Sequence, residues 1–202
     1  FLAYLGIFNL LGDGGLGGAA VKRISESSEH RQFFSAYMCL RFILLAVSIT
    51  ILIIVAPYLK DLTESGMFYW LLLGLVVSAG TNITTSGIYG RGKVGVYQAN
   101  TLFAHIFQTG IQIIAVFFGF EAAGLVGGVL AGGFATIFLN FRHLDITPAK
   151  FSRKHVSSLS AFATWTFLAT SGSLVFSYAD TILISYFMTT KDVGVYRVTF
   201  QL

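Results

Sequence analysis

Charged residues are scarce in this sequence, and cysteine is almost absent. Only 11% of the 202 residues are charged, whereas 55% are hydrophobic. This composition leaves too little polar surface to cover a water-soluble globule of this size. The single Cys39 excludes a disulfide framework and a cysteine-based zinc site built from this chain alone. We therefore expect a protein whose main solvent is lipid.

Metal and cofactor sites are not indicated either. His105 has no second His or Cys at ligand spacing. The glycines of residues 12–17 match a dinucleotide-binding fingerprint by letter, but an apolar helix is expected around them and no strand precedes them. We therefore expect no metal and no cofactor. The other three histidines, His30, His143 and His155, are expected to be solvated in cytoplasmic loops.

The apolar residues form stretches that are each about long enough to cross a bilayer, which takes about 20 residues of helix. They predict an all-α, polytopic transmembrane helical bundle with six spans and the start of a seventh. The sixth is longer than a perpendicular helix needs, so it must tilt, bend or break. The expected spans are residues 1–20, 33–59, 67–89, 99–120, 122–141, 158–188 and 193–202.

The basic residues predict the orientation of these spans, because Lys and Arg near span ends are retained on the cytoplasmic side. One side holds only Lys60 and Lys191. Since the basic residues are scattered beside spans, we expect no nucleic-acid partner. The cytoplasmic set is Lys22, Arg23, Arg31, Arg91, Lys93, Arg142, Lys150, Arg153 and Lys154.

A few charged residues lie inside the spans, namely Asp13, Arg41, Asp180 and Arg197. Each costs about 2.5–3.5 kcal/mol at mid-depth on insertion scales, so such residues normally face a protein interior or a watery cavity. A structural ion pair, or a side chain that reaches the interface from near a span end, is the alternative.

Uncharged polar residues form stripes at helical spacing, which favours a shared polar cavity. Hydrogen bonding between helices is the alternative for any one stripe. Glycines at residues 12–15 lower the cost of bending the first span. The stripes are Asn9 and Asp13 in the first span, Ser78, Asn82, Thr85 and Tyr89 in the third, and Thr101, His105, Gln108 and Gln112 in the fourth.

Two segments carry a resemblance to a known family. Residues 178–187, Tyr-Ala-Asp-Thr-Ile-Leu-Ile-Ser-Tyr-Phe, and residues 192–196, Asp-Val-Gly-Val-Tyr, resemble the start of the C-terminal half of polysaccharide flippases. Residues 1–26, with Leu11-Gly12 and the late Lys-Arg-Ile-Ser-Glu, resemble the second helix of that family. The family belongs to the multidrug/oligosaccharidyl-lipid/polysaccharide exporter superfamily.

The resemblance implies two six-helix bundles that form a V around a central cavity, of which this chain would be a fragment. Residues 1–141 would supply helices 2–6 of the first bundle, with the first helix missing. Residues 142–157 would form a cytoplasmic linker. Residues 158–202 would begin the second bundle, with helix 7 and the start of helix 8.

The function implied by the resemblance is the movement of a polyprenyl-linked oligosaccharide from the cytoplasmic to the outer leaflet of the plasma (inner) membrane, by alternating access. The bilayer, coupling ions and other polysaccharide-assembly proteins are the expected partners, and no enzymatic activity is expected. A multidrug or small-molecule antiporter of the same superfamily is one alternative. An intramembrane polysaccharide polymerase or glycosyltransferase is another.

The candidate substrate-binding residues come from the charges and stripes rather than from a family motif. Arg41 could bind a pyrophosphate, since guanidinium forms paired hydrogen bonds with phosphate oxygens. Asp13 could couple an ion gradient or pair with Arg41. Sugar hydroxyls could be bound by Asn82, His105, Gln108 and Gln112. The full set is Asp13, Arg41, Asn82, His105, Gln108, Gln112 and Asp180.

Overall fold

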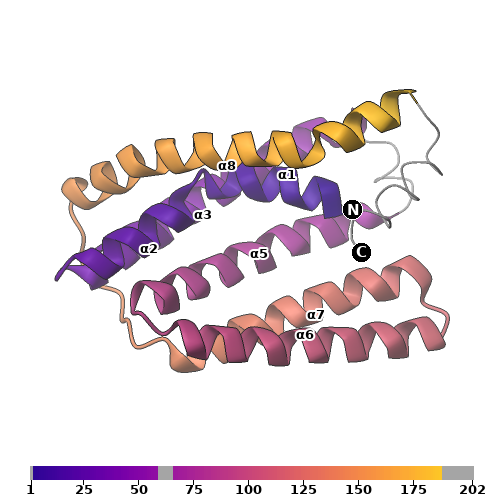
Figure 1. Cartoon of the computed structure of the whole chain (residues 1–202), viewed down its shortest axis with the longest axis horizontal. Coiled ribbons are helices and arrows are strands. Elements are labelled where there is room, and N and C mark those ends of the chain that lie inside the picture. The colour runs from indigo at the N-terminus through magenta and orange to yellow at the C-terminus, as the bar shows by residue number, and fades with distance from the viewer. Residues whose placement is uncertain (1, 59–65, 188–202) are drawn as a thin grey trace.

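The structure, a computed structural model, describes residues 2–58 and 66–187, and every regular element in these ranges is helical. The predicted all-α, polytopic helical bundle is confirmed (Figure 1). The expected span at 193–202, with Arg197, lies outside the described residues. The elements are α1 (Leu2–Asp13), α2 (Leu16–Glu26), α3 (His30–Val55), the 3-10 turn η1 (Ala56–Tyr58), α5 (Met67–Gly90), α6 (Val94–Phe117), α7 (Glu121–His143) and α8 (Arg153–Phe187).

Within residues 2–58 and 66–187, four helices are long and apolar enough to cross a membrane: α3, α5, α6 and α7. They coincide with the second to fifth predicted spans. Their outward surfaces are rich in exposed apolar side chains such as Phe103, Phe107 and Phe117 of α6. Such surfaces suit contact with lipid rather than water.

The first predicted span is not one helix. α1 and α2, of 12 and 11 residues, are separated at Gly14 and Gly15, and neither is long enough to cross a bilayer alone. Gly14 has φ +54° and Gly15 has φ +75°. Residues with a Cβ rarely adopt this left-handed conformation, so the two glycines together interrupt the helix.

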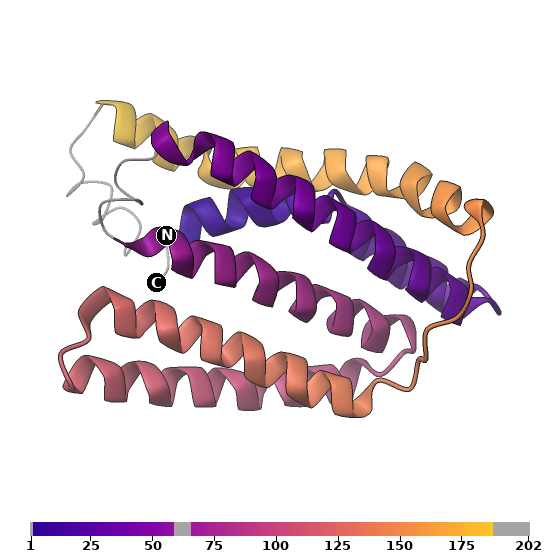
Figure 2. The same ribbon diagram turned by 180° about the vertical axis from the view of Figure 1, so that it is seen from behind.

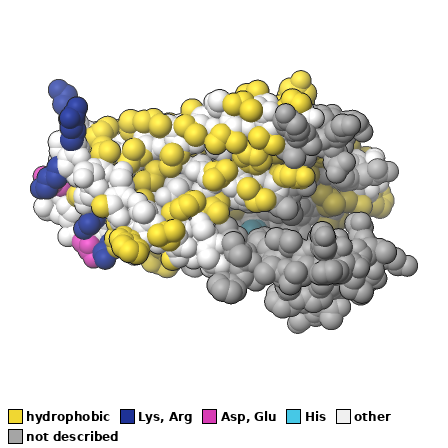
Figure 3. Space-filling view, turned by 90° about the horizontal axis from the view of Figure 1, so that it is seen from above, with side chains coloured by type: hydrophobic (Ala, Val, Ile, Leu, Met, Phe, Trp, Pro, Cys, Tyr) yellow, Lys and Arg dark blue, Asp and Glu magenta, His cyan; other side chains and the backbone are white. Residues whose placement is uncertain are grey.

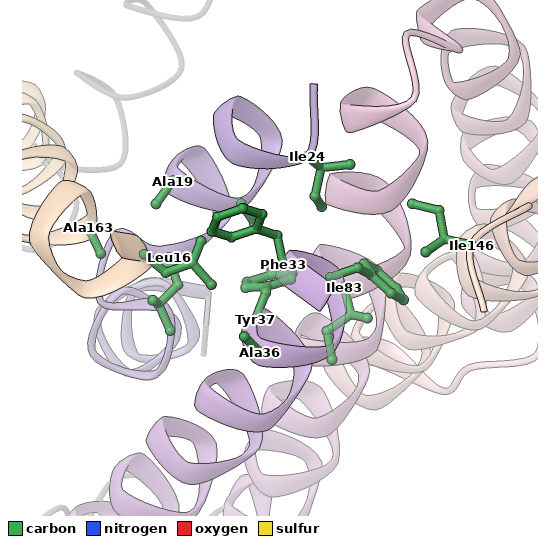
Figure 4. Packing of buried hydrophobic residues seen from close by; sticks show 12 residues of the cluster. Leu16, Ala19, Ile24, Phe33, Ala36, Tyr37, Ile83, Ile146 and Ala163 are labelled. Atoms are coloured by element: carbon green, nitrogen blue, oxygen red, sulfur yellow. The ribbon is translucent and has the colours of Figure 1, made fainter. Parts of the chain in front are cut away.

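The helices pack into two groups around α5. α6 and α7 form a pair on one side, and α8 lies on the other side along α2 and α3 (Figures 1 and 2). α5 contacts α7 on one side and α1, α2 and α3 on the other. A buried apolar cluster joins α2, α3, α5 and α8, with Leu16, Phe33, Tyr37, Ile83 and Ala163 among its members (Figure 4).

The basic residues expected on the cytoplasmic side gather at one end of the bundle (Figure 3). They lie in or beside the connections from α2 to α3, from α5 to α6 and from α7 to α8. We refer to this end as the basic end. Lys60 and Lys191, expected on the opposite side, lie outside the described residues.

The connection between α7 and α8 is attached to the rest of the bundle. Residues 144–152, which we call the strap, have no regular structure. Arg31 Nε donates a hydrogen bond to the Thr147 carbonyl at 3.3 Å, and the Ala149 backbone N–H donates to Ser35 Oγ at 2.8 Å. Both bonds fix the strap to the first turns of α3.

A second attachment holds the start of the strap to the turn between α5 and α6. Lys93 Nζ lies 3.1 Å from Asp145 Oδ2, and Arg91 Nε lies 3.7 Å from Asp145 Oδ1. Partial burial raises the pKa of Asp145, but the hydrogen bond from Lys93 and the two positive charges outweigh it and hold this pKa below its usual value. Since all three groups are partly exposed, the contribution to stability is small.

His155, expected to be solvated, is buried at 6% exposure, so that expectation is wrong. Its Nδ1 accepts a hydrogen bond from the Ser152 backbone N–H at 3.1 Å, and Nε2 lies 3.2 Å from Glu29 Oε2. The ring also meets Phe33 edge to face, with centroids 4.8 Å apart. His155 therefore ties the start of α8 to the start of α3.

α7 and α8 extend into the predicted linker from both sides, because α7 ends at His143 and α8 begins at Arg153. The long sixth span forms a single helix of 35 residues. The predicted division into bundles at 141 and 158 stays a prediction.

Substituting Gly15 by Ala should destabilise the protein. An alanine here would have to adopt a left-handed backbone conformation, which costs about 1–2 kcal/mol. Its Cβ would also meet backbone atoms of Ala163 and Phe167 on α8. We expect a lower melting temperature of the full-length protein in detergent. Gly95→Ala is the matched control, because nothing lies within 4 Å of its added Cβ. Equal melting temperatures for the two variants would contradict this packing.

Substituting His155 by Ala should also destabilise the protein, by about 1–3 kcal/mol, because Glu29 and Ser152 lose a buried partner. Thermal unfolding of the full-length protein in detergent measures the loss. His105→Ala, at an exposed position of α6, should leave the melting temperature unchanged. If both variants have the parental melting temperature, His155 does not hold α8 to α3.

Candidate functional site: a polar cleft beside a buried ion pair

Arg41 lies at the centre of a polar cluster inside the bundle. It projects from α3 and is only 1% exposed. Its Nη2 donates a hydrogen bond to Asn9 Oδ1 at 2.7 Å, and its Nη1 lies 3.6 Å from Asp13 Oδ1. Both partners are on α1, one turn apart, as the spacing predicted. The predicted pairing of Asp13 with Arg41 is therefore present, and the two charges compensate each other.

Asn9 connects this pair to α5. The Asn82 amide donates to Asn9 Oδ1 at 3.4 Å, so Asn9 Oδ1 accepts from two helices at once. Near this point Ser48 Oγ of α3 donates to the backbone carbonyl of Phe8 at 2.7 Å. These bonds set the position of α1 relative to α3 and α5.

The break between α1 and α2 gives Asp13 a second role. Its Oδ2 accepts a hydrogen bond from the Gly17 backbone N–H at 3.3 Å, across the break. The first N–H groups of a helix have no partner within the helix and carry partial positive charge. The carboxylate at the end of α1 therefore stabilises the beginning of α2.

A cleft of about 370 Å³ opens beside this cluster. Its volume falls within the range of about 300–1,000 Å³ that is typical of ligand pockets. A smaller hollow of about 150 Å³ adjoins it, and Asn9 and Asn82 line both. The cleft is bounded by α1, α2, α5 and α8, and its lining is Gly6, Asn9, Leu10, Asp13, Gly17, Asn82, Thr85, Ser86 and Thr170.

Three of the predicted site residues thus lie together, but their roles differ. Asp13 and Asn82 line the cleft, whereas Arg41 is not among its lining residues. Arg41 lies behind Asn9 and Asp13 and orients both of them. Its contact with a pyrophosphate stays a prediction.

The structure does not bring the predicted residues of α6 to the cleft. His105 is exposed on the surface of α6. Gln112 Nε2 donates to the Leu125 carbonyl of α7 at 3.0 Å, and Gln108 packs against Gly132 of α7. The glutamines therefore join α6 to α7, which was the alternative reading of their stripe. Asp180 falls on α8 beyond the part of that helix whose side chains are described.

Sequence reasoning missed four polar lining residues as site candidates: Asn9, Thr85, Ser86 and Thr170. Asn9 and Thr85 belonged to the predicted stripes, so helical spacing could have found them. Ser86 follows Thr85 directly and carried no signal of its own. Its hydroxyl donates to Tyr37 Oη of α3 at 3.3 Å, a contact that only the packing of α3 on α5 creates.

The whole chain, residues 1–202, matches a family described as polysaccharide biosynthesis protein. This chain belongs to that family. The family confirms the resemblance to polysaccharide flippases noted in the sequence. No solved structure matches the chain.

Two curated relatives come from Haloferax volcanii. The "Probable low-salt glycan biosynthesis flippase Agl15" is 24% identical over 201 residues, covering 100% of this chain and 43% of the relative. The "Probable flippase AglR" is 24% identical over 201 residues, covering 93% of this chain and 40% of the relative. The chain thus spans about two fifths of the length of the relatives it matches, and both are named as transporters rather than enzymes.

Removing one partner of the ion pair should destabilise the protein more than removing both partners. Arg41→Leu leaves Asp13 facing an apolar bundle without its partner, and such changes typically cost about 3–5 kcal/mol. We expect the low end of this range, because the Asp13 side chain is 22% exposed. The variant with Arg41→Leu and Asp13→Leu should be more stable than Arg41→Leu alone. Thermal unfolding of full-length variants in detergent tests this, and strictly additive losses would contradict the pairing.

Proposed function

We propose that this chain is part of a flippase that moves a lipid-linked oligosaccharide from the cytoplasmic to the outer leaflet of the plasma membrane. The polar cleft beside the Asp13 and Arg41 pair is the observation that supports it most directly. The lipid tail would stay in the bilayer while the sugar passes through the bundle interior. The names of the two relatives support the same class of activity.

The chemistry of the cleft suits sugar better than phosphate. The Asn82 amide nitrogen is used toward Asn9, so its carbonyl oxygen is left to accept. Asp13 adds a carboxylate, which accepts hydrogen bonds, while Arg41, the cation that compensates its charge, is not among the lining residues. Sugar hydroxyls are donors that match these acceptors. We therefore assign the sugar portion of the substrate to this cleft, with Arg41 positioning Asn9 and Asp13.

The interrupted helix supports an alternating-access mechanism. In transporters of several folds, discontinuous helices lie at the substrate site, and rocking of one bundle against another exposes that site to either side. Here the break at Gly14 and Gly15 lies directly beside the cleft. We propose that α1 and α2 change their relative angle at this break during transport, with the second bundle supplied by the rest of the protein.

The alternative of a drug exporter gains no support from the cleft. Its described lining contains no aromatic residue, although the chain has 20 phenylalanines. Phe103, Phe107, Phe134 and Phe138 are exposed on α6 and α7 instead. These aromatic side chains are placed to contact lipid rather than a drug.

The test is translocation of a fluorescent lipid-linked oligosaccharide in proteoliposomes that contain the full-length protein. Asn82→Leu should slow translocation about tenfold or more, since it removes a cleft acceptor and the bond to Asn9. Gln112→Leu is the matched control, because this amide bonds α7 away from the cleft, and it should transport at close to the parental rate.

A second arm of the experiment uses the lipid carrier of this substrate with its pyrophosphate group but without the sugars. Its translocation should be insensitive to Asn82→Leu if the cleft binds the sugar. Parental protein that exports cationic drugs and moves no lipid-linked oligosaccharide would reject the proposed function. Equal losses for Asn82→Leu and Gln112→Leu would reject the assignment of the cleft.

A further inference from the structure

Behind the cleft, a chain of buried amides joins α5, α6 and α7. Asn140 of α7 is 0% exposed and Asn100 of α6 is 6% exposed. The Asn100 amide donates to Asn140 Oδ1 at 3.1 Å, and the Asn140 amide donates to Thr85 Oγ1 at 3.4 Å. His143 Nδ1 lies 3.4 Å from the Asn100 amide, at the basic end of the bundle. The chain of contacts thus ends on Thr85, which lines the cleft.

The Thr85 hydroxyl differs from those of neighbouring threonines in its hydrogen bonding. Thr81 and Thr84 on the same helix donate to their own backbone, to the carbonyls of Val77 and Gly80, both at 3.0 Å. Among the described residues, no such acceptor receives the Thr85 proton. A threonine oxygen can accept while its proton donates elsewhere. Because Asn140 donates to this oxygen, the Thr85 proton is available to donate to a group bound in the cleft that Thr85 lines.

The amide oxygen of Asn140 determines that Asn140 is the donor in its bond with Thr85. Its carbonyl oxygen already accepts from Asn100, so its NH₂ group is the part that faces Thr85. An amide buried at this depth in an apolar bundle has a strong preference for full pairing, since each unpaired group is costly. In this arrangement the bond from Asn100 orients the Asn140 amide, and Asn140 in turn donates to Thr85.

We propose that Asn140 is a positioning residue for substrate recognition, which sets the Thr85 hydroxyl as a hydrogen-bond donor to an oxygen of the bound sugar. This inference rests on the proposed function of the cleft. Asn82 and Asp13 supply acceptors for sugar hydroxyls, and Thr85 supplies an oriented donor on the next turn of α5. The cleft thus selects a sugar that presents a hydrogen-bond acceptor, such as a ring oxygen or an acetamido carbonyl, opposite Thr85.

A double-mutant cycle on the full-length protein tests this, with Thr85→Val, Asn140→Leu and both together. Translocation of the lipid-linked oligosaccharide is measured over a range of substrate concentrations. Thr85→Val should raise the apparent KM about tenfold with little change in kcat. Asn140→Leu should raise it to a similar extent, and the double variant should be no worse than Thr85→Val. This non-additivity is expected because Asn140 acts on the sugar through Thr85.

Two control variants separate recognition from stability. Thr84→Val and Thr136→Val each remove a buried hydroxyl whose bond is to its own helix, and both should keep the parental KM. Melting temperatures are recorded for every variant. If Asn140→Leu does not fold, Asn140→Ser replaces it, because its short side chain removes the amide toward Thr85 while it stays polar.

The outcomes distinguish this inference from the proposed function. A parent that transports, with multiplicative effects of Thr85→Val and Asn140→Leu on KM, overturns the role of Asn140 and leaves the flippase assignment intact. The same holds if Asn140 variants lower the melting temperature and kcat while KM stays parental. A parent that translocates no lipid-linked oligosaccharide overturns both.

Discussion

The ion pair between Arg41 and Asp13 is the interaction on which the arrangement of the first helices depends. A guanidinium at 1% exposure inside an apolar bundle must have its charge compensated. Asp13 compensates this charge and Asn9 accepts a hydrogen bond from Nη2, both from one helix, so α1 cannot move away from α3 without uncovering a charge. Asn9 extends the constraint to α5 and Asp13 extends it to α2. One cationic side chain thereby relates four helices to one another.

The interruption at Gly14 and Gly15 is the second constraint, and Asp13 connects it to the first. In a continuous helix the Gly17 N–H would donate to the backbone carbonyl of Asp13, whereas at the break it donates to the Asp13 carboxylate. The missing side chain of Gly15 also allows the backbone of α8 to approach closely. The cleft lies where these three features meet, with Asn9 and Asp13 on one wall and α5 on the other.

Helical periodicity predicted the polar wall of the cleft only in part. On α5 the stripe with Asn82 and Thr85 does face the cleft. On α6 the two glutamines of an equally regular stripe face α7, because Gly128 and Gly132 leave room there for Gln108 and Gln112, whereas His105 of the same stripe is exposed. Spacing shows which residues share a face of a helix, but the face itself does not reveal whether a neighbouring helix or a cleft lies opposite.

The sequence by itself determined the lipid environment, the positions of α3, α5, α6 and α7, and the gathering of basic residues at one end. These properties are sums over many residues, so no single contact can reverse them. Only the tertiary structure decided that Asn9 accepts from Arg41, 32 positions away, and that His155 is buried beside Glu29, 126 positions away. Such pairings depend on how helices approach each other in three dimensions, and the bond from Asn140 to Thr85 follows from the same packing.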